Sequence, residues 1–188
     1  MIHKLNFYFI KELDKYHINK LPKNIAIIYR DYSQKYDEKK ILEIKKFCKL
    51  NRRKFYLAND LALVKKLNLD GAYIPSFNTD INVIGLKTRN MTIIGSAHNI
   101  REINQKKKQG VDYLFISPVF KTTKKNNFLG LIKFSILSRK FNKSVVALGG
   151  INKSNLKKIN NLKNYGFASI SYIKNNINKN VSDFKKKN

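Results

Sequence analysis

The chain has 188 residues, the size of one domain, and 43% of them are hydrophobic, enough for one sizeable core, so wholesale disorder is excluded. Lys and Arg number 39 against 12 Asp and Glu, a formal net charge of +27. No apolar run approaches the ~18 residues of a membrane span, and the first fifteen residues hold no signal-peptide core. The single cysteine, Cys48, excludes an internal disulfide framework and fits a reducing compartment. We therefore expect one soluble, cytoplasmic domain over residues 1–188.

The positive charge is mostly Lys and accompanies many Asn and Ile, three residues whose codons are A/T-rich. Lys attracts polyanions, but the chain carries no zinc, helix-turn-helix or RNP-like pattern. We therefore expect no membrane partner and no nucleic-acid partner. A basic, nucleic-acid-associated protein stays open as an alternative that rests on charge alone.

Short apolar runs alternate with helical patterns along the chain. Such near-continuous apolar runs are typical of parallel strands buried on both faces. The predicted strands are Asn6–Ile10, Ile25–Tyr29, Lys54–Leu57, Gly71–Ile74, Thr92–Ile94, Tyr113–Ile116, Ser144–Leu148 and Phe167–Ile170. Helical patterns cover Asp37–Leu50, Leu61–Leu67, Asn99–Gln109, Leu131–Lys140 and Ser154–Leu162, and an apolar stripe at Ile173, Ile177, Val181 and Phe184 predicts that the tail packs on the body.

Eight strands alternating with helices predict an α/β fold, a compact (β/α)₈ TIM barrel. The chain is short for this fold, so some connections must be trimmed. Ile10–Lys23 and Ser76–Arg89, after strands 1 and 4, show little helical periodicity, and we expect the trimming there. An open α/β sheet is the alternative, although no Gly-x-Gly-x-x-Gly loop follows the first strand.

Chemistry in such barrels lies at the carboxyl ends of the strands. Glycines after strand seven and a small polar residue after strand eight predict a phosphate cradle of backbone N–H groups. The loop after strand six adds hydroxyl and ammonium groups that suit a diphosphate. The residues at these ends are Arg30, Asn59, Asp60, Ser96, His98, Thr122, Lys121, Lys124, Lys125, Gly149, Gly150 and Ser171.

Several of these residues also have a purely structural interpretation. Gly149-Gly150 can be a tight turn, and the three lysines of the loop can be solvated surface. Asp60 can cap the following helix while it binds a ligand, and His98, beside a helix start, fits a structural role. Ser96 has no base on its own loop, so a nucleophilic serine is not predicted.

The residues resemble thiamine phosphate synthase and its TenI-like relatives, roughly from Ile25 to Ile173. The most specific stretches are Val111–Thr122 and Val145–Ile151. The matching positions are Arg30, Asn59-Asp60, Asp70-Gly71, Ser96-x-His98, Gly110-Val111-Asp112-Tyr113, Ser117-Pro118-Val119-Phe120-x-Thr122, Leu129-Gly130, Ala147-Leu148-Gly149-Gly150-Ile151 and Ile170-Ser171.

The resemblance implies a transferase that joins hydroxymethylpyrimidine diphosphate to thiazole phosphate, giving thiamine phosphate and pyrophosphate. It implies that Arg30 and Lys125 are catalytic and that Asp60 holds Mg²⁺. It also implies that Arg30 contacts the pyrimidine diphosphate. The implied substrate-binding residues are Asn59, Ser96 and Thr122, with Gly150, Ile170 and Ser171 around the thiazole phosphate.

The chain departs from the family pattern at several positions. Ile28 and Tyr32 replace a Gln and a Lys beside the arginine, and Asn78 replaces a second metal carboxylate, for which Asp80 is the nearest substitute. Lys124 stands where the loop pattern has a hydroxyl, and Pro118 stands where tautomerases have a His. Three hypotheses remain: a synthase with a reduced metal site, a non-catalytic or regulatory barrel that binds a thiamine precursor, and the nucleic-acid-associated protein.

Overall fold

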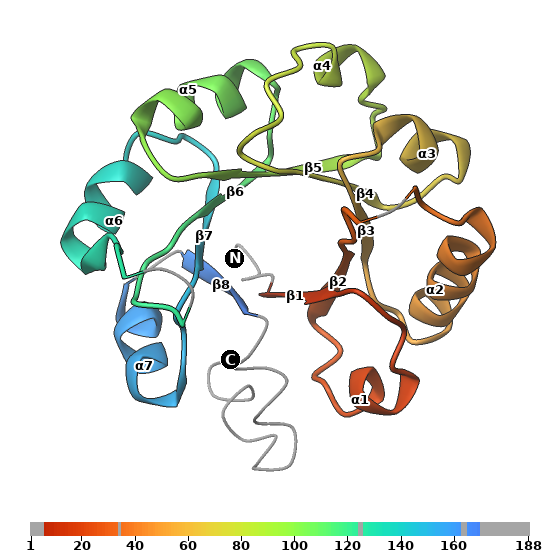
Figure 1. Ribbon diagram of the computed structural model, residues 1–188, viewed down its shortest axis with the longest axis horizontal. Coiled ribbons are helices and arrows are strands. Elements are labelled where there is room, and N and C mark those ends of the chain that lie inside the picture. The colour runs from red at the N-terminus through yellow and green to blue at the C-terminus, as the bar shows by residue number, and fades with distance from the viewer. Residues whose placement is uncertain (1–5, 34, 124–125, 163–164, 170–188) are drawn as a thin grey trace.

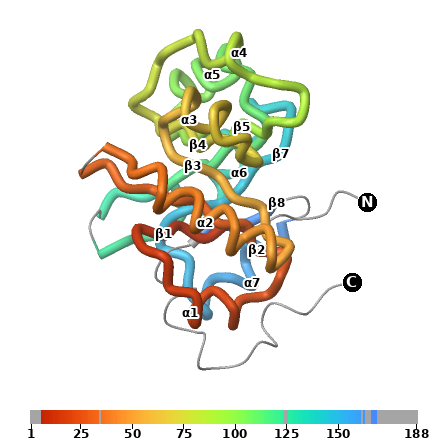
Figure 2. The backbone as a smooth tube through the Cα atoms, turned by 90° about the vertical axis from the view of Figure 1, so that its right-hand side faces the viewer, coloured from red at the N-terminus to blue at the C-terminus, as the bar shows by residue number. Residues whose placement is uncertain are grey.

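The computed structural model describes residues 6–33, 35–123, 126–162 and 165–169, and they form a closed barrel of parallel strands in the order β1 to β8. The helices ring the strands (Figure 1). The view turned by 90° separates α1 and α7 on one side from α3, α4 and α5 on the other (Figure 2). The barrel prediction is confirmed, and the open sheet is excluded because β1 pairs with β8, Phe7 opposite Ala168.

The elements follow the predicted alternation closely. The strands are β1 (Asn6–Ile10), β2 (Ile25–Tyr29), β3 (Phe55–Ala58), β4 (Gly71–Ile74), β5 (Thr92–Ala97), β6 (Tyr113–Ile116), β7 (Ser144–Leu148) and β8 (Tyr165–Ser169). The helices are α1 (Lys15–Asn19), α2 (Glu38–Leu50), α3 (Leu61–Lys66), α4 (Val83–Leu86), α5 (Ile100–Lys108), α6 (Gly130–Ser138) and α7 (Lys153–Asn161). The trimmed connections after strands 1 and 4 are the short helices α1 and α4, as expected.

Side chains from the strands fill the barrel interior. Phe115 lies against Phe7, with ring centroids 4.9 Å apart, and against Tyr73 at 5.7 Å. Such tilted aromatic contacts pack the centre of the barrel as a core of side chains. The interior cluster consists of Phe7, Phe9, Ala26, Ile28, Tyr56, Ala58, Tyr73, Ile94, Phe115, Val146 and Ala168.

A second layer of apolar residues lies between the strands and the helices. It includes Ile41 and Ile44 of α2 and Cys48, all three fully buried or nearly so. Burial raises the pKa of the Cys48 thiol to about 12, so Cys48 is an inert core residue. The tail stripe from Ile173 to Phe184 lies outside the described residues.

Two aspartates at the amino-terminal rim of the barrel hydrogen-bond to neighbouring strands. Asp70 accepts the Phe55 N–H at 2.9 Å, and Asp112 accepts the Ile93 N–H at 2.9 Å and the Lys87 ammonium at 2.7 Å. These carboxylates belong to the stretches that resemble the known family. Their role here is to join neighbouring strands, so they support the fold and not the chemistry.

None of the helices in the described part of the chain has the length and apolarity needed to cross a membrane.

Candidate functional site

The carboxyl-terminal rim is organised by the side chains that begin its helices. Asp14, Asp37 and Asp60 each accept a backbone N–H in the first turn of the helix that follows, and Asn99 and Asn152 do the same for α5 and α7. Each cap satisfies an N–H that lacks a partner within its helix. The helix starts, and the loops before them, are therefore held in place around the barrel mouth.

Arg30 directly follows β2 at this rim. Its backbone N–H donates to the Ile10 carbonyl at 2.9 Å, and its guanidinium lies 4.5 Å from the centre of the Phe9 ring. A guanidinium over an aromatic face is held by cation–π attraction, and the Arg30 guanidinium also hydrogen-bonds the Tyr73 side chain, which leaves further N–H groups of its five to donate to a ligand. The structure therefore places the Arg30 charge over the barrel mouth, where the sequence predicts an anion site.

Tyr73 of β4 brings Arg30 and Ser96 together in one polar group inside the mouth. Burial raises the pKa of the Tyr73 phenol, and hydrogen bonding from Ser96 and the charge of Arg30 oppose that rise. The sequence predicts that Ser96 follows strand five, but β5 extends to Ala97, so Ser96 lies within the strand and is only 4% exposed. The predicted position is wrong because the strand continues past Ile94 to pair with β6, Ser96 opposite Phe115.

Asn59 and Asp60 follow β3, next to Arg30 in the barrel order. Asn59 has a left-handed backbone, with φ 60°, and its Oδ1 accepts the Asn78 amide at 2.7 Å. Asp60 caps α3 by accepting the Leu63 N–H at 2.9 Å. The structural interpretation of Asp60 is therefore correct, and a carboxylate that uses one oxygen for the cap keeps its other oxygen for a ligand.

The carboxyl rim offers few side chains that could bind a metal ion. Among the described residues, no three carboxylate, imidazole or thiol side chains gather closely enough to hold one. Asp80, the suggested substitute, caps its own turn by accepting the Asn82 N–H at 2.9 Å. Mg²⁺ is often held by one or two carboxylates together with substrate phosphates, so Asp60 fits a Mg²⁺ whose remaining ligands come from a diphosphate.

The loop after β6 folds back onto the end of β7. The Val119 N–H donates to the Leu148 carbonyl at 2.9 Å, and the Phe120 N–H donates to the Gly149 carbonyl at 3.1 Å. A Cβ at Gly150, whose φ is 67°, would strike the carbonyls of Phe120 and Lys121. Gly150 is thus required by the close approach of two loops and by its backbone conformation.

The carbonyl of Gly150 is occupied, whereas its N–H is available as a donor on the carboxyl rim. The Asn155 amide donates to the Gly150 carbonyl at 2.9 Å, and no described residue accepts the Gly150 N–H. An N–H held this way beside the start of α7 suits a phosphate oxygen. Thr122 lies half-buried in the loop after β6, whereas Lys125, Ile170 and Ser171 lie outside the described residues.

His98 has a structural role, in agreement with the second of its two interpretations. Its Nδ1 lies 2.6 Å from the Ser117 carbonyl, so Nδ1 carries the proton and donates. The His98 backbone N–H donates to Glu102 of α5 at 2.8 Å. The ring therefore joins the ends of β5 and β6.

Sequence reasoning missed three residues that shape the site: Tyr73, Lys106 and Gln109. Lys106 and Gln109 are fully buried and hydrogen-bond to the loop that carries Asn78. The available signal was a Lys at helical spacing after buried Ile103, a position where α5 should be apolar.

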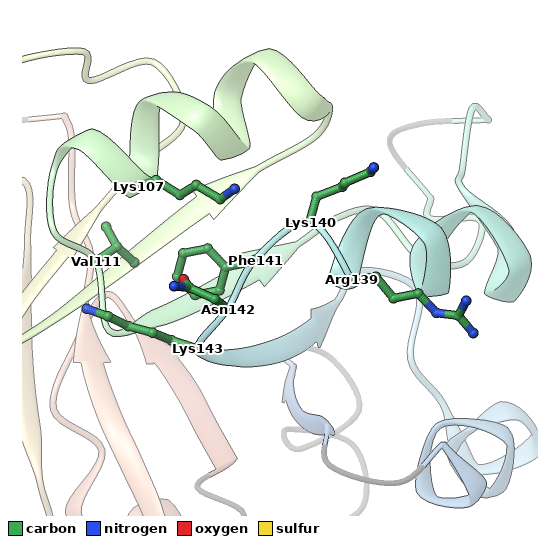
Figure 3. Close-up of a pocket in the computed structure, with 7 residues that line it drawn as sticks. All are labelled: Lys107, Val111, Arg139, Lys140, Phe141, Asn142 and Lys143. Atoms are coloured by element: carbon green, nitrogen blue, oxygen red, sulfur yellow. The ribbon is translucent and has the colours of Figure 1, made fainter.

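The opposite rim carries a basic depression of about 480 Å³ (Figure 3). Lys107 reaches into it from α5, and Lys140 and Lys143 come from the connection between α6 and β7. Of these, Lys143 pairs with Asp112 at 3.2 Å. This depression lies at the amino ends of β6 and β7, away from the polar residues of the carboxyl rim.

Solved structures share the barrel. Thiamine phosphate pyrophosphorylase from Pyrococcus furiosus superposes with a TM-score of 0.72 over 89% of this chain and 85% of that one, at 22% identity. The same enzyme from Bacteroides thetaiotaomicron gives a TM-score of 0.56 over 89% and 82%, at 18% identity. Identity this low supports likeness of fold alone.

Curated relatives are closer in sequence. Thiamine-phosphate synthase of Prochlorococcus marinus subsp. pastoris is 34% identical over 153 residues, which are 80% of this chain and 43% of that protein. The enzyme of Methanococcus maripaludis strain C5 is 31% identical over 63% of this chain and 58% of its own length. The chain thus spans less than two thirds of the length of these relatives.

A family model described as thiamine monophosphate synthase matches residues 22–173, which run from before β2 past β8 and contain every rim residue described above from Arg30 onward. This match, together with a relative that is 34% identical over 80% of the chain, is sufficient to assign the chain to a family. The chain belongs to the thiamine monophosphate synthase family.

Proposed function

We propose that this protein is a transferase of thiamine biosynthesis that joins hydroxymethylpyrimidine diphosphate to thiazole phosphate. The observation that carries the proposal is the placement of Arg30 and Gly150 on one rim, within a chain that matches the family over residues 22–173. The guanidinium suits a diphosphate, and the glycine N–H suits a monophosphate.

In the proposed reaction the bond between the pyrimidine methylene carbon and the diphosphate oxygen breaks, and the diphosphate keeps the electron pair. The thiazole nitrogen donates its lone pair to the methylene carbon, so thiamine phosphate and pyrophosphate form without net proton transfer. The barrier falls mainly through neutralisation of the leaving diphosphate. Arg30 supplies a fixed positive charge for this purpose, and Lys125 is proposed to add a second.

The remaining residues are proposed to bind and orient the substrates. Asn59 and Ser96 would contact the pyrimidine substrate, and Thr122 would lie with Lys125 at the ends of the two substrates' phosphates. Gly150, Ile170 and Ser171 are proposed to bind the thiazole phosphate through main-chain N–H groups. Asp60 would hold Mg²⁺, which supplies positive charge to the diphosphate when bound. The buried Cys48 thiol fits the cytoplasmic location that we infer.

A turnover assay tests the proposed transferase activity directly. Purified protein, both substrates and Mg²⁺ should give thiamine phosphate and pyrophosphate in equal amounts. Arg30→Met should lower turnover at least about a hundredfold, in the range seen when one charge-stabilising donor is removed. Arg139→Met, on the opposite rim, is the matched control and should leave turnover unchanged. Equal activity of the two variants would contradict the role of Arg30.

One observation favours a second candidate function, a non-catalytic or regulatory barrel that binds a thiamine precursor. Ile28, at the position of a family Gln, is fully buried among the apolar residues of the interior. A site with fewer polar groups for the pyrimidine can retain binding and lose turnover. Tight binding of thiamine phosphate without any product formation would select this alternative.

A further inference from the structure

Lys106 is a fully buried lysine on α5 that points into the loop after β4. Its ammonium donates to the carbonyls of Pro75 and Asn78, each at 2.7 Å, and to Oε1 of Gln109 at 2.8 Å. An ammonium donates and cannot accept a hydrogen bond. The identity of the Gln109 atom that faces Lys106 is therefore determined: it is the oxygen.

Because Oε1 of Gln109 faces Lys106, its amide nitrogen faces the loop. That Nε2 donates to the Asp80 carbonyl at 2.8 Å and to the Asn78 carbonyl at 3.1 Å, and it lies 3.4 Å from Oδ1 of Asn78. Two buried polar side chains thus hold the backbone of residues 78–80 against α5.

The Asn78 side chain is oriented by a second donor. Its Oδ1 accepts the Asp80 backbone N–H at 2.9 Å, so its Nδ2 is the end that faces Asn59 and donates to Oδ1 of Asn59 at 2.7 Å. With that oxygen occupied, the NH₂ group is the available end of Asn59. No described residue accepts from that NH₂ group, and Asn59 is exposed at the mouth.

We propose that Lys106, Gln109 and Asn78 are positioning residues that turn the Asn59 amide so that its NH₂ group donates to an anionic oxygen of the substrate diphosphate. This inference rests on the proposed function. In the series of hydrogen bonds that links the buried Lys106 ammonium to Asn59 at the rim, the donor of each bond is fixed. The site would therefore bind part of the diphosphate charge directly, so some affinity for the diphosphate should remain without Mg²⁺.

A carboxylate at position 78 would reverse this arrangement. Aspartate only accepts, so Asn59 would turn its NH₂ group toward residue 78 and present Oδ1 at the mouth. A carbonyl oxygen suits a cation and repels a phosphate oxygen. Asn78→Asp therefore tests the orientation itself.

The experiment measures binding of inorganic pyrophosphate to the full chain by calorimetry, with Mg²⁺ and with a chelator. For the unsubstituted protein, pyrophosphate binding should remain measurable after removal of Mg²⁺. Asn78→Asp should weaken Mg²⁺-free binding at least a further tenfold, about the effect of one charge-assisted hydrogen bond, and Mg²⁺ should restore most of it. Asn78→Ala, which adds no charge, should weaken Mg²⁺-free binding by a smaller factor.

Thr79→Asp is the matched control, because it adds the same charge at an exposed neighbouring residue without touching Asn59. It should change the Mg²⁺-free affinity less than Asn78→Asp does. Equal effects of the two aspartates, or pyrophosphate binding by the unsubstituted protein only with Mg²⁺, would overturn the inference and leave the proposed function intact. No pyrophosphate binding under either condition would overturn both.

Discussion

The ring of Tyr32 meets the ring of Phe77 edge to face, with centroids 5.6 Å apart. Tyr32 follows β2 and Phe77 follows β4, so the pair spans the end of β3, where Asn59 lies. Both side chains are exposed, yet partial burial of the phenol group raises the pKa of Tyr32, and Tyr73 and Arg30 also act on it electrostatically. An aromatic bridge therefore occupies the place where the family resemblance expects a lysine.

Tyr32→Lys should strengthen pyrophosphate binding. The substitution replaces a neutral ring with an ammonium next to Arg30, and one added charge pair near the surface is worth up to about 1 kcal/mol, or about fivefold in affinity. The gain should shrink in about 0.5 M salt, because exposed charges are screened. Calorimetry at two salt concentrations measures both effects, with Tyr16→Lys on α1 as the control. A gain equal in the two variants would mean that only net charge matters.

Gly150→Ala should destabilise the protein by at least about 2 kcal/mol, since a left-handed φ costs about 1–2 kcal/mol and the new methyl group also strikes two carbonyls. It should also abolish binding of thiazole phosphate. Gly130 has a similar φ, 70°, but a methyl group there would meet no atom within 4 Å, so Gly130→Ala should cost the backbone strain alone. Urea denaturation measures the difference. Equal losses of stability in the two variants would show that the close approach of the two loops does not require a glycine at position 150.

Asp60→Asn should separate the two roles of Asp60. Asn is as good a helix cap as Asp, so the free energy of unfolding should change by less than about 0.5 kcal/mol. Any strengthening of pyrophosphate binding by Mg²⁺ should disappear, because the carboxylate is lost. Calorimetric titration with and without Mg²⁺ checks this outcome. An unchanged Mg²⁺ effect would assign the metal to other ligands.

The buried ammonium of Lys106 should make stability depend on pH. Burial lowers the pKa of Lys106 to about 8, whereas its ordinary value is 10.5. Between these values the unfolded chain binds more protons than the folded protein, so stability rises with pH. Between pH 8 and pH 10.5, the free energy of unfolding of the unsubstituted protein should rise by about 1–3 kcal/mol more than that of Lys106→Met. Denaturation curves of both proteins at several pH values measure it, and a constant difference would contradict the burial of the charged group.

Local patterns predicted most of the fold. The apolar runs of β2 and β7 and the cap at Asn99 are encoded in a few consecutive residues, and the structure confirms them. The weak periodicity of Ile10–Lys23 and Ser76–Arg89 correctly located α1 and α4, the two shortest helices among the residues that the structure describes.

The series of hydrogen bonds from Lys106 to Asn59 could not be predicted from local sequence patterns. Its members come from the end of α5 and from the loops after β3 and β4, and the hydrogen bonds that join these different segments link residues 19 to 31 positions apart. A lysine in a Lys-rich chain is assigned to the surface by default, and only the packing of α5 on the loop shows that Lys106 is buried. The end of β5 was misplaced for a related reason, since strand length depends on pairing with β6.

Whether the carboxyl rim binds both phosphate groups is best tested by a crystal structure of the protein with thiamine phosphate and pyrophosphate. We expect the thiamine phosphate at the Gly150 N–H, and the pyrophosphate at Arg30 and the Asn59 NH₂ group. Phosphate groups found instead at the opposite rim, among Lys107, Lys140 and Lys143, would contradict the proposed site.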